Sequence, residues 1–204
     1  MTEVSLVLPS SGLGEETPRQ YFRRFLGQHA ASVRDLAWYF DQALPQFAVN
    51  PEVRLAVEEL VDHLGRAIGF ITQREEAAGY GSWESPGGSH LLVWVLDSQS
   101  AIRQIGQSTR VRDALLATPA LPSGSQATCL FVIGGPVNQR VLADTVTFRR
   151  SSDHIRLLTV DAARVLAELV EQGEVSHDAA LTLLRPPGVF ADPLVAMLQR
   201  PAAE

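Results

Sequence analysis

The longest apolar runs in the chain predict two strands of a central sheet. Residues 91–96 read Leu-Leu-Val-Trp-Val-Leu, and residues 129–133 read Cys-Leu-Phe-Val-Ile. Such runs, without polar alternation and rich in β-branched and aromatic side chains, are typical of strands buried on both faces. A Pro-Gly-Gly turn at residues 86–88 precedes the first run. We therefore expect residues 82–98 to form a β-hairpin.

The spacing of apolar positions elsewhere predicts helices around this sheet. We expect helices over residues 17–44, 50–69, 100–116, 161–172, 176–185 and 192–200, and a helix or loop over residues 139–144. Thr17-Pro18 and Asn50-Pro51 mark helix starts, because the polar side chain caps the helix and proline fits its first turn. Gly27 is expected to kink or divide the first helix, and Asp161 is expected to cap the fourth. Shorter apolar stretches predict further strands over residues 70–72, 145–149 and 155–160.

This order of elements predicts an α/β fold with a mixed β-sheet flanked by helices. The same pattern divides the chain into four segments. These are a flexible N-terminal arm (residues 1–16), an N-terminal helical element (17–49), an α/β core (50–173) and a C-terminal helical tail (174–204).

The charge balance argues against extensive binding to a phosphate backbone, which needs basic clusters. The net charge is −6, and all 17 basic residues are arginine, so the chain contains no lysine. The candidates for contact with nucleic acid are Arg103, Arg110 and Arg112, or Arg149 and Arg150.

Other classes of protein are disfavoured by what the sequence lacks. Cys129 is the only cysteine, so no disulfide can form within the chain. No apolar run approaches the ~18 residues that a membrane helix needs, and the N-terminus lacks the features of a signal peptide. No P-loop or dinucleotide-binding fingerprint appears. We therefore expect a cytoplasmic protein without a membrane partner.

Four segments between residues 50 and 173 follow the pattern of one known fold. They read VRLAVEELVDHLGRAIGF (53–70), YGSWESPGGSHLLVWVLDS (80–98), TCLFVIGG (128–135) and HIRLLTVDAARVLAELVEQG (154–173). Together they resemble the core of the PD-(D/E)XK family, the restriction-endonuclease-like nucleases. In active members, a Glu of the first core helix, an Asp on the second strand and a Glu-X-Lys on the third surround one or two divalent metal ions. The resemblance implies a restriction-endonuclease-like mixed sheet for residues 50–173.

The resemblance also implies that the catalytic positions have lost their chemistry. The Glu-X-Lys would fall on Trp94 and Leu96, and an indole cannot ligate Mg²⁺ any more than an aliphatic chain can replace the lysine. The strand aspartate would fall near Tyr80 or Glu84, and neither residue is an aspartate. The degenerate site is therefore expected at Glu58, Glu59, Glu84, Trp94, Leu96 and Asp97, with no metal ion and no cofactor.

We therefore expect a catalytically inactive nuclease-like subunit that serves as a structural or recognition component of a bacterial multi-protein assembly, such as a genome-defence or DNA-processing system. Its partner would be another protein or a second copy of the chain, contacted through the aromatic-rich first helix or residues 176–200. One alternative is a Mg²⁺-dependent nuclease whose ligands have migrated to Glu84, Asp97 and Glu58 or Glu59. Others are a nucleic-acid-binding module without catalysis and an α/β interaction domain unrelated to nucleases.

Overall fold

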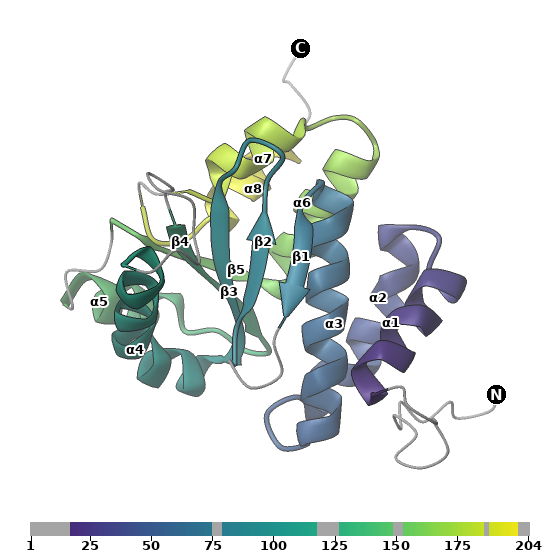
Figure 1. Cartoon of the computed structure of the whole chain (residues 1–204), viewed down its shortest axis with the longest axis horizontal. Helices are drawn as coiled ribbons and strands as arrows, with labels where there is room; N and C mark the ends of the chain where they lie inside the picture. The colour runs from purple at the N-terminus through teal and green to yellow at the C-terminus, as the bar shows by residue number, and fades with distance from the viewer. Residues whose placement is uncertain (1–16, 75–78, 118–126, 149–152, 186–187, 200–204) are drawn as a thin grey trace.

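The computed structural model describes residues 17–74, 79–117, 127–148, 153–185 and 188–199. At its centre is a five-stranded sheet of β1 (Ile71–Arg74), β2 (Gly81–Glu84), β3 (His90–Asp97), β4 (Ala127–Gly134) and β5 (Ile155–Thr159). The strands lie side by side in chain order (Figure 1). The pairs β1–β2 and β2–β3 are antiparallel, whereas β3–β4 and β4–β5 are parallel. This mixed sheet confirms the predicted α/β fold class and the hairpin.

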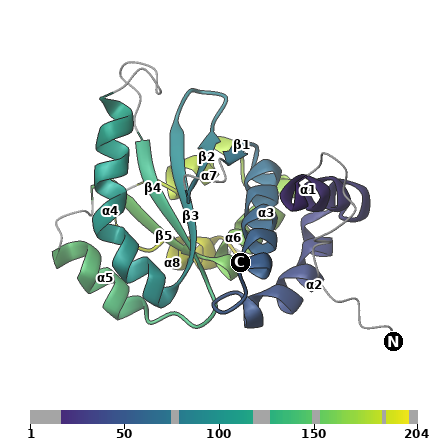
Figure 2. The same cartoon turned by 60° about the horizontal axis from the view of Figure 1, so that its bottom comes forward.

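Helices cover the sheet on both sides. They are α1 (Pro18–His29), α2 (Val33–Ala43), α3 (Pro51–Ile68), α4 (Ser98–Leu116), α5 (Gln139–Phe148), α6 (Val160–Glu171), α7 (His177–Leu183) and α8 (Asp192–Leu198), with a short 3₁₀ turn, η1 (Leu44–Gln46), after α2. Figure 2 shows α3 between the sheet and the α1–α2 pair, with α4 and α5 on the opposite side. Within the described residues, no helix combines the length and apolar character that crossing a membrane requires.

Strand β3 divides the core into two clusters, because successive side chains of a strand point to opposite faces of the sheet. Leu91, Val93 and Val95 belong to the cluster that includes the buried faces of α1, α2, α3, α6 and α7. Trp94 and its neighbours two residues away belong to the cluster formed with α4 and α5, where Trp94 stacks on Phe131 with ring centroids 5.3 Å apart. The prediction that β3 is buried on both faces is confirmed.

The start and end signals of α3 act as the sequence predicts. The Asn50 side chain accepts hydrogen bonds from the backbone N–H groups of Glu52 and Val53. Gly69 ends the helix in the left-handed conformation, with φ = 104°. Between these caps, α3 carries an apolar stripe that packs on the sheet, so the helix is fixed against β1 and β3.

Three local predictions are wrong. The expected first helix is two helices, and the break lies at residues 30–32, where Ser32 caps α2, rather than at Gly27 inside α1. The described part of residues 145–149 belongs to helix α5 instead of a strand, because Leu142 and Val146, four residues apart, are buried on one helical face. Helix α6 is capped by Thr159 instead of Asp161. The N-terminal arm lies outside the described residues.

Candidate functional site

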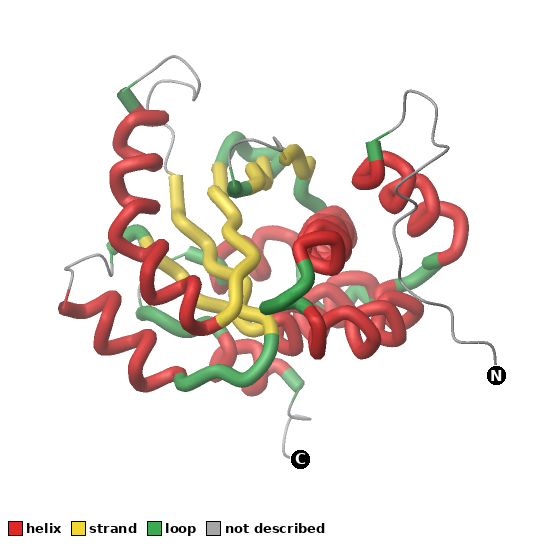
Figure 3. Tube along the Cα trace, turned by 90° about the horizontal axis from the view of Figure 1, so that it is seen from below, coloured by secondary structure: helices red, strands yellow, loops and turns green. Residues whose placement is uncertain are grey.

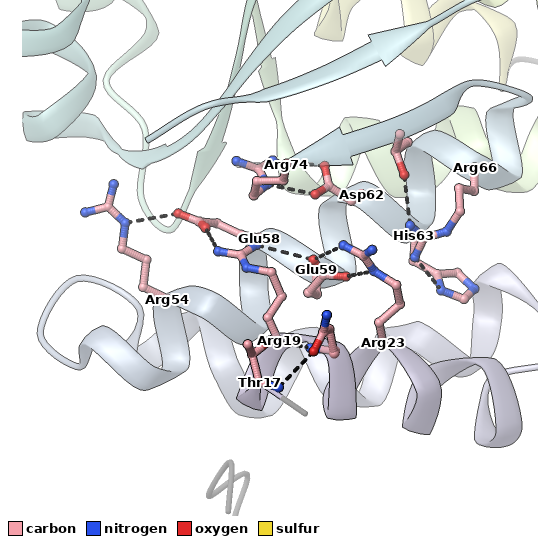
Figure 4. Close-up of polar contacts among 12 residues, drawn as sticks. Thr17, Arg19, Arg23, Arg54, Glu58, Glu59, Asp62, His63, Arg66 and Arg74 are labelled. Atoms are coloured by element: carbon pink, nitrogen blue, oxygen red, sulfur yellow. Dashed lines mark hydrogen bonds and ion pairs between the residues drawn. The ribbon is translucent and has the colours of Figure 1, made fainter. Parts of the chain in front are cut away.

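Helix α3 presents three buried carboxylates. Glu58, Glu59 and Asp62 have relative exposures of 7%, 0% and 1%. Ionised carboxylates are costly to bury unless they are paired with cations and hydrogen-bonded. Their cationic partners come from α1, from α3 itself and from β1, and Figure 4 shows how these side chains converge.

Two arginines of α1 hold the two glutamates. The capping box at Thr17 starts α1 so that Arg19 and Arg23, four residues apart, lie on the same face of the helix. Arg19 donates from Nη2 to Glu58 at 2.6 Å and from Nη1 to Glu59 at 3.3 Å. Arg23 donates to both oxygens of Glu59, at 2.9 and 2.8 Å. The pKa of Arg23 is raised, chiefly by this hydrogen bond to Glu59. These contacts fix α1 to the core.

The third carboxylate, Asp62, is held from the sheet. Arg74 of β1 donates to its two oxygens in a bidentate pair, at 2.7 and 2.9 Å, and both side chains are at most 2% exposed. The indole Nε1 of Trp83 also donates to Asp62, at 2.9 Å. A Cβ added at Gly81 would lie 2.8 Å from Nη2 of Arg74. The Arg74 guanidinium therefore fills the space between α3 and β2.

Two arginines of α3, Arg54 and Arg66, lie beside these ion pairs, and Arg54 takes part in them. Arg54 donates from Nε to Glu58 at 3.3 Å. Arg66 donates to the Thr72 hydroxyl at 2.8 Å and lies 3.3 Å from Nδ1 of His63. Burial and the nearby Arg66 charge lower the pKa of His63. We call Arg19, Arg23, Arg54, Arg74, Glu58, Glu59 and Asp62 the ion cluster; it holds four positive and three negative side chains.

The structure does not bring all the expected site positions together. Glu58 and Glu59 lie on the α3 side of the sheet, whereas Trp94 and Leu96 point to the α4 side. The β3 side chains on the α3 side next to these two are Val93 and Val95. A shift of one residue along a strand moves a side chain to the other face. The two β3 positions that face α3 here are therefore both valine, and neither carries an acid or a lysine.

The remaining candidates also lie apart from the ion cluster. Glu84 pairs with Ile71 and His90 across the sheet, and alternation from Trp83, which packs on α3, directs it to the opposite face. Asp97 caps α4 by accepting hydrogen bonds from Gln99 and Ser100. Burial acts to raise the pKa of Asp97, but these hydrogen bonds outweigh it and hold the pKa below its usual value.

Three of the arginines considered for nucleic-acid contact lie on α4. Arg103 and Arg110 are exposed on α4, seven residues apart and therefore on one face. Arg112 is paired with Asp113 at 2.7 Å. Arg149 and Arg150 lie outside the described residues.

A pocket of about 280 Å³ opens at the end of β3. Its walls include Phe47, Arg54, Leu96, Asp97 and Arg103. It is therefore the place where the expected position Asp97 meets the edge of the ion cluster, through Arg54.

Within the part of the chain that the structure describes, no group of three or more His, Cys, Asp or Glu side chains is arranged to hold a metal ion.

Much of the ion cluster escaped the sequence analysis. The ion-cluster residues outside the expected site are Arg19, Arg23, Arg54, Asp62 and Arg74. Two signals were available: the i, i+4 spacing of Arg19 and Arg23, and the position of Asp62 four residues after Glu58, which puts both acids on one side of α3. Nothing local identifies Arg74, because its partner is on another element.

The sheet combines an antiparallel meander, β1–β3, with parallel strands β3–β5 and is packed between helices, an arrangement consistent with the restriction-endonuclease-like fold. No family model and no curated protein matches the sequence. Two solved structures of the restriction endonuclease FokI are similar. One, bound to DNA, has a TM-score of 0.50 at 12% identity and covers 87% of this chain. The other has a TM-score of 0.52 at 10% identity and covers 85%.

This similarity shows the fold alone, because the sequence identities are so low. The chain spans about a third of the FokI chain, 35% in one structure and 34% in the other.

Proposed function

We propose that this chain is a nuclease-fold domain that binds without cleaving, and that it serves as a structural or recognition component of a larger assembly. The observation that carries the proposal is the pairing of Asp62 with Arg74 and Trp83 in the space between α3 and the sheet. The side chains that face Asp62 and α3 in this space are a guanidinium, an indole and the apolar Val93 and Val95, and none of them offers an oxygen ligand to a metal ion.

The energetics favour this reading. To bind a divalent cation, Glu58, Glu59 or Asp62 would have to release an arginine that is buried with it. Breaking a buried ion pair by removing one partner costs about 3–5 kcal/mol, because the other charge is left uncompensated. The chain also has no lysine to assist hydrolysis at a phosphate. Nuclease chemistry would therefore require the core packing of α1 and β1 to be undone.

The second candidate is a metal-dependent nuclease with relocated ligands. Its best support is the proximity of Asp97 and Arg54, which holds Glu58, at the pocket beyond β3. Against it, Asp97 already accepts three hydrogen bonds as the cap of α4.

The exposed apolar side chains Trp38 on α2 and Met197 on α8 supply contacts for the binding role.

A cleavage assay separates the two candidates. The purified chain is incubated with plasmid DNA and with single-stranded DNA and RNA, in Mg²⁺ and in Mn²⁺, beside Glu58→Gln and Asp97→Asn. We expect the wild type and both variants to show the same background without metal dependence. Metal-dependent cleavage that Glu58→Gln or Asp97→Asn abolishes would overturn the proposal. Light scattering of the native chain, alone and with the products of neighbouring genes, tests the assembly role; a monomer throughout contradicts it.

A further inference from the structure

The pocket at the end of β3 lies where small ligands bind in many α/β proteins. Its walls come from the segment before α3, the first turn of α3, the last residues of β3 and the first turns of α4. Figure 3, seen from below, shows these segments meeting at one end of the strands. Crevices outside the carboxyl ends of parallel strands are common binding sites in α/β sheets. The position of this pocket alone makes it a candidate.

The charged hydrogen-bond donors in the wall of this pocket are two guanidinium groups. The first backbone N–H groups of α3 and α4 are already taken by the side chains of Asn50 and Asp97. Arg54 comes from α3 and Arg103 from α4, and α3 and α4 lie on opposite faces of the sheet. Both arginines therefore reach one cavity from different layers of the fold.

Each of these arginines is held in place at one end of its guanidinium. Arg54 donates through Nε to Glu58 at 3.3 Å. Arg103 donates through Nη2 to the Ser100 hydroxyl at 3.2 Å, and that hydroxyl donates to Asp97 at 2.5 Å. Their remaining N–H groups have no hydrogen-bond partner among the described residues. Preorganised arginine forks are suited to phosphate oxygens.

The charge and size of the pocket limit what it can hold. The lining side chains, two arginines and one carboxylate, carry a single excess positive charge, which the ion pair between Arg54 and Glu58 partly offsets, and the Asp97 oxygens are already occupied by α4. The volume of about 280 Å³ lies just below the ~300–1,000 Å³ of sites for drug-sized ligands. We propose that this pocket binds a phosphate group between Arg54 and Arg103. This proposal is independent of whether the ion cluster lacks nuclease activity.

Titration with inorganic phosphate tests the proposal. The full chain in a phosphate-free buffer is titrated by calorimetry and by ³¹P NMR, and we expect saturable binding at millimolar concentrations or below. Arg103→Gln is expected to weaken binding about tenfold or more, since it removes charge-assisted hydrogen bonds. Arg110→Gln on the same helix lies outside the pocket and should leave the affinity unchanged. Equal losses in both variants would show general electrostatics and overturn the proposal.

A second probe distinguishes the source of the phosphate group. Single-stranded oligonucleotides of one sequence are compared with a 5′-phosphate and with a 5′-hydroxyl. Tighter binding of the phosphorylated form that Arg103→Gln abolishes assigns the pocket to a strand end, whereas binding of inorganic phosphate alone assigns it to a small phosphorylated molecule. Absence of saturable binding for inorganic phosphate and for both oligonucleotides, with the fold of the protein verified by circular dichroism, overturns the proposal.

Discussion

The two sides of the sheet differ in the side chains that they bury beside their apolar cores. On the α4 side, Trp94 stacks on Phe131 and the neighbouring side chains are apolar. On the α3 side, the apolar core ends at the ion cluster, where Asp62 and Arg74 are as deeply buried as the aromatic pair. Strand β3 therefore borders an apolar core on both faces, and on the α3 side a charged cluster adjoins that core.

The difference shows which face the fold can change at low cost. An apolar cluster depends on volume, so a smaller side chain leaves a cavity whose cost grows with its size. A charged cluster depends on the pairing of opposite charges. Removing one partner leaves an uncompensated buried charge, whereas replacing both by apolar side chains can leave the free energy of unfolding nearly unchanged. The following substitutions test this contrast by the free energy of unfolding in urea.

Asp62→Ala is expected to have the largest effect. It leaves the buried Arg74 without its bidentate partner and the Trp83 indole without an acceptor. We expect a loss of about 3–5 kcal/mol, toward the upper end because two donors are orphaned. Adding Arg74→Leu to a matched Asp62→Leu variant should recover part of the loss, since both charges then leave the core. A double variant less stable than Asp62→Leu alone would contradict the view that charge balance governs this face.

Trp94→Ala tests the apolar face. Trp94 is 1% exposed and contacts the rings of Tyr80 and Phe131. We expect a loss of about 3–5 kcal/mol from transfer and cavity terms, without any change on adding salt. Trp94→Phe keeps most of the apolar volume and should lose clearly less. Equal losses in the two variants would show that the stability at this position does not follow volume.

Gly65→Ala examines the close packing between α3 and the sheet, with a smaller expected effect. A Cβ at Gly65 would lie 2.6 Å from Cε2 of Trp83, whose indole is also tied to Asp62. We expect a loss of about 1–3 kcal/mol from overpacking. Gly27→Ala on α1 is the matched control, because nothing lies within 4 Å of its added Cβ. There we expect a gain of about 0.5–1 kcal/mol from helix propensity.

Most of the fold could be predicted from the sequence because its signals are local. The apolar runs of β3 and β4, the Asn50 cap and the Gly69 stop each act within a few residues. The break between α1 and α2 was missed because its capping box, from Ser32 to Asp35, lies inside a continuous helical pattern. In α5 the short stretch 145–149 alternates like a strand, and the tertiary contacts of Val146 decide for helix.

The site was harder to predict, because it depends on contacts between distant elements. Glu58 and Glu59 could be identified on one helix, but their partner Arg19 lies 39 and 40 residues away in sequence. The face to which Trp94 points was also beyond the sequence, since a strand buried on both sides carries no polar alternation to fix its register. Hence residues that the sequence assigned to one site lie on two different faces of the sheet.

Cys129 offers the mildest comparison of the two faces, because it lies within the apolar one as the only cysteine of the chain. Burial, its largest influence, raises the pKa of the thiol to about 12 from 9.0. The folded state therefore keeps the proton between these pH values while the unfolded state loses it, so stability falls as pH rises above about 9 and is unaffected by this group below that. The slope is at most about 1.4 kcal/mol per pH unit.

Urea unfolding of the wild type and Cys129→Ala from pH 8 to 10.5 measures this slope. The difference in stability between the two proteins should be constant below pH 9 and shrink above it, and a constant difference throughout would mean that water reaches this thiol in the folded protein.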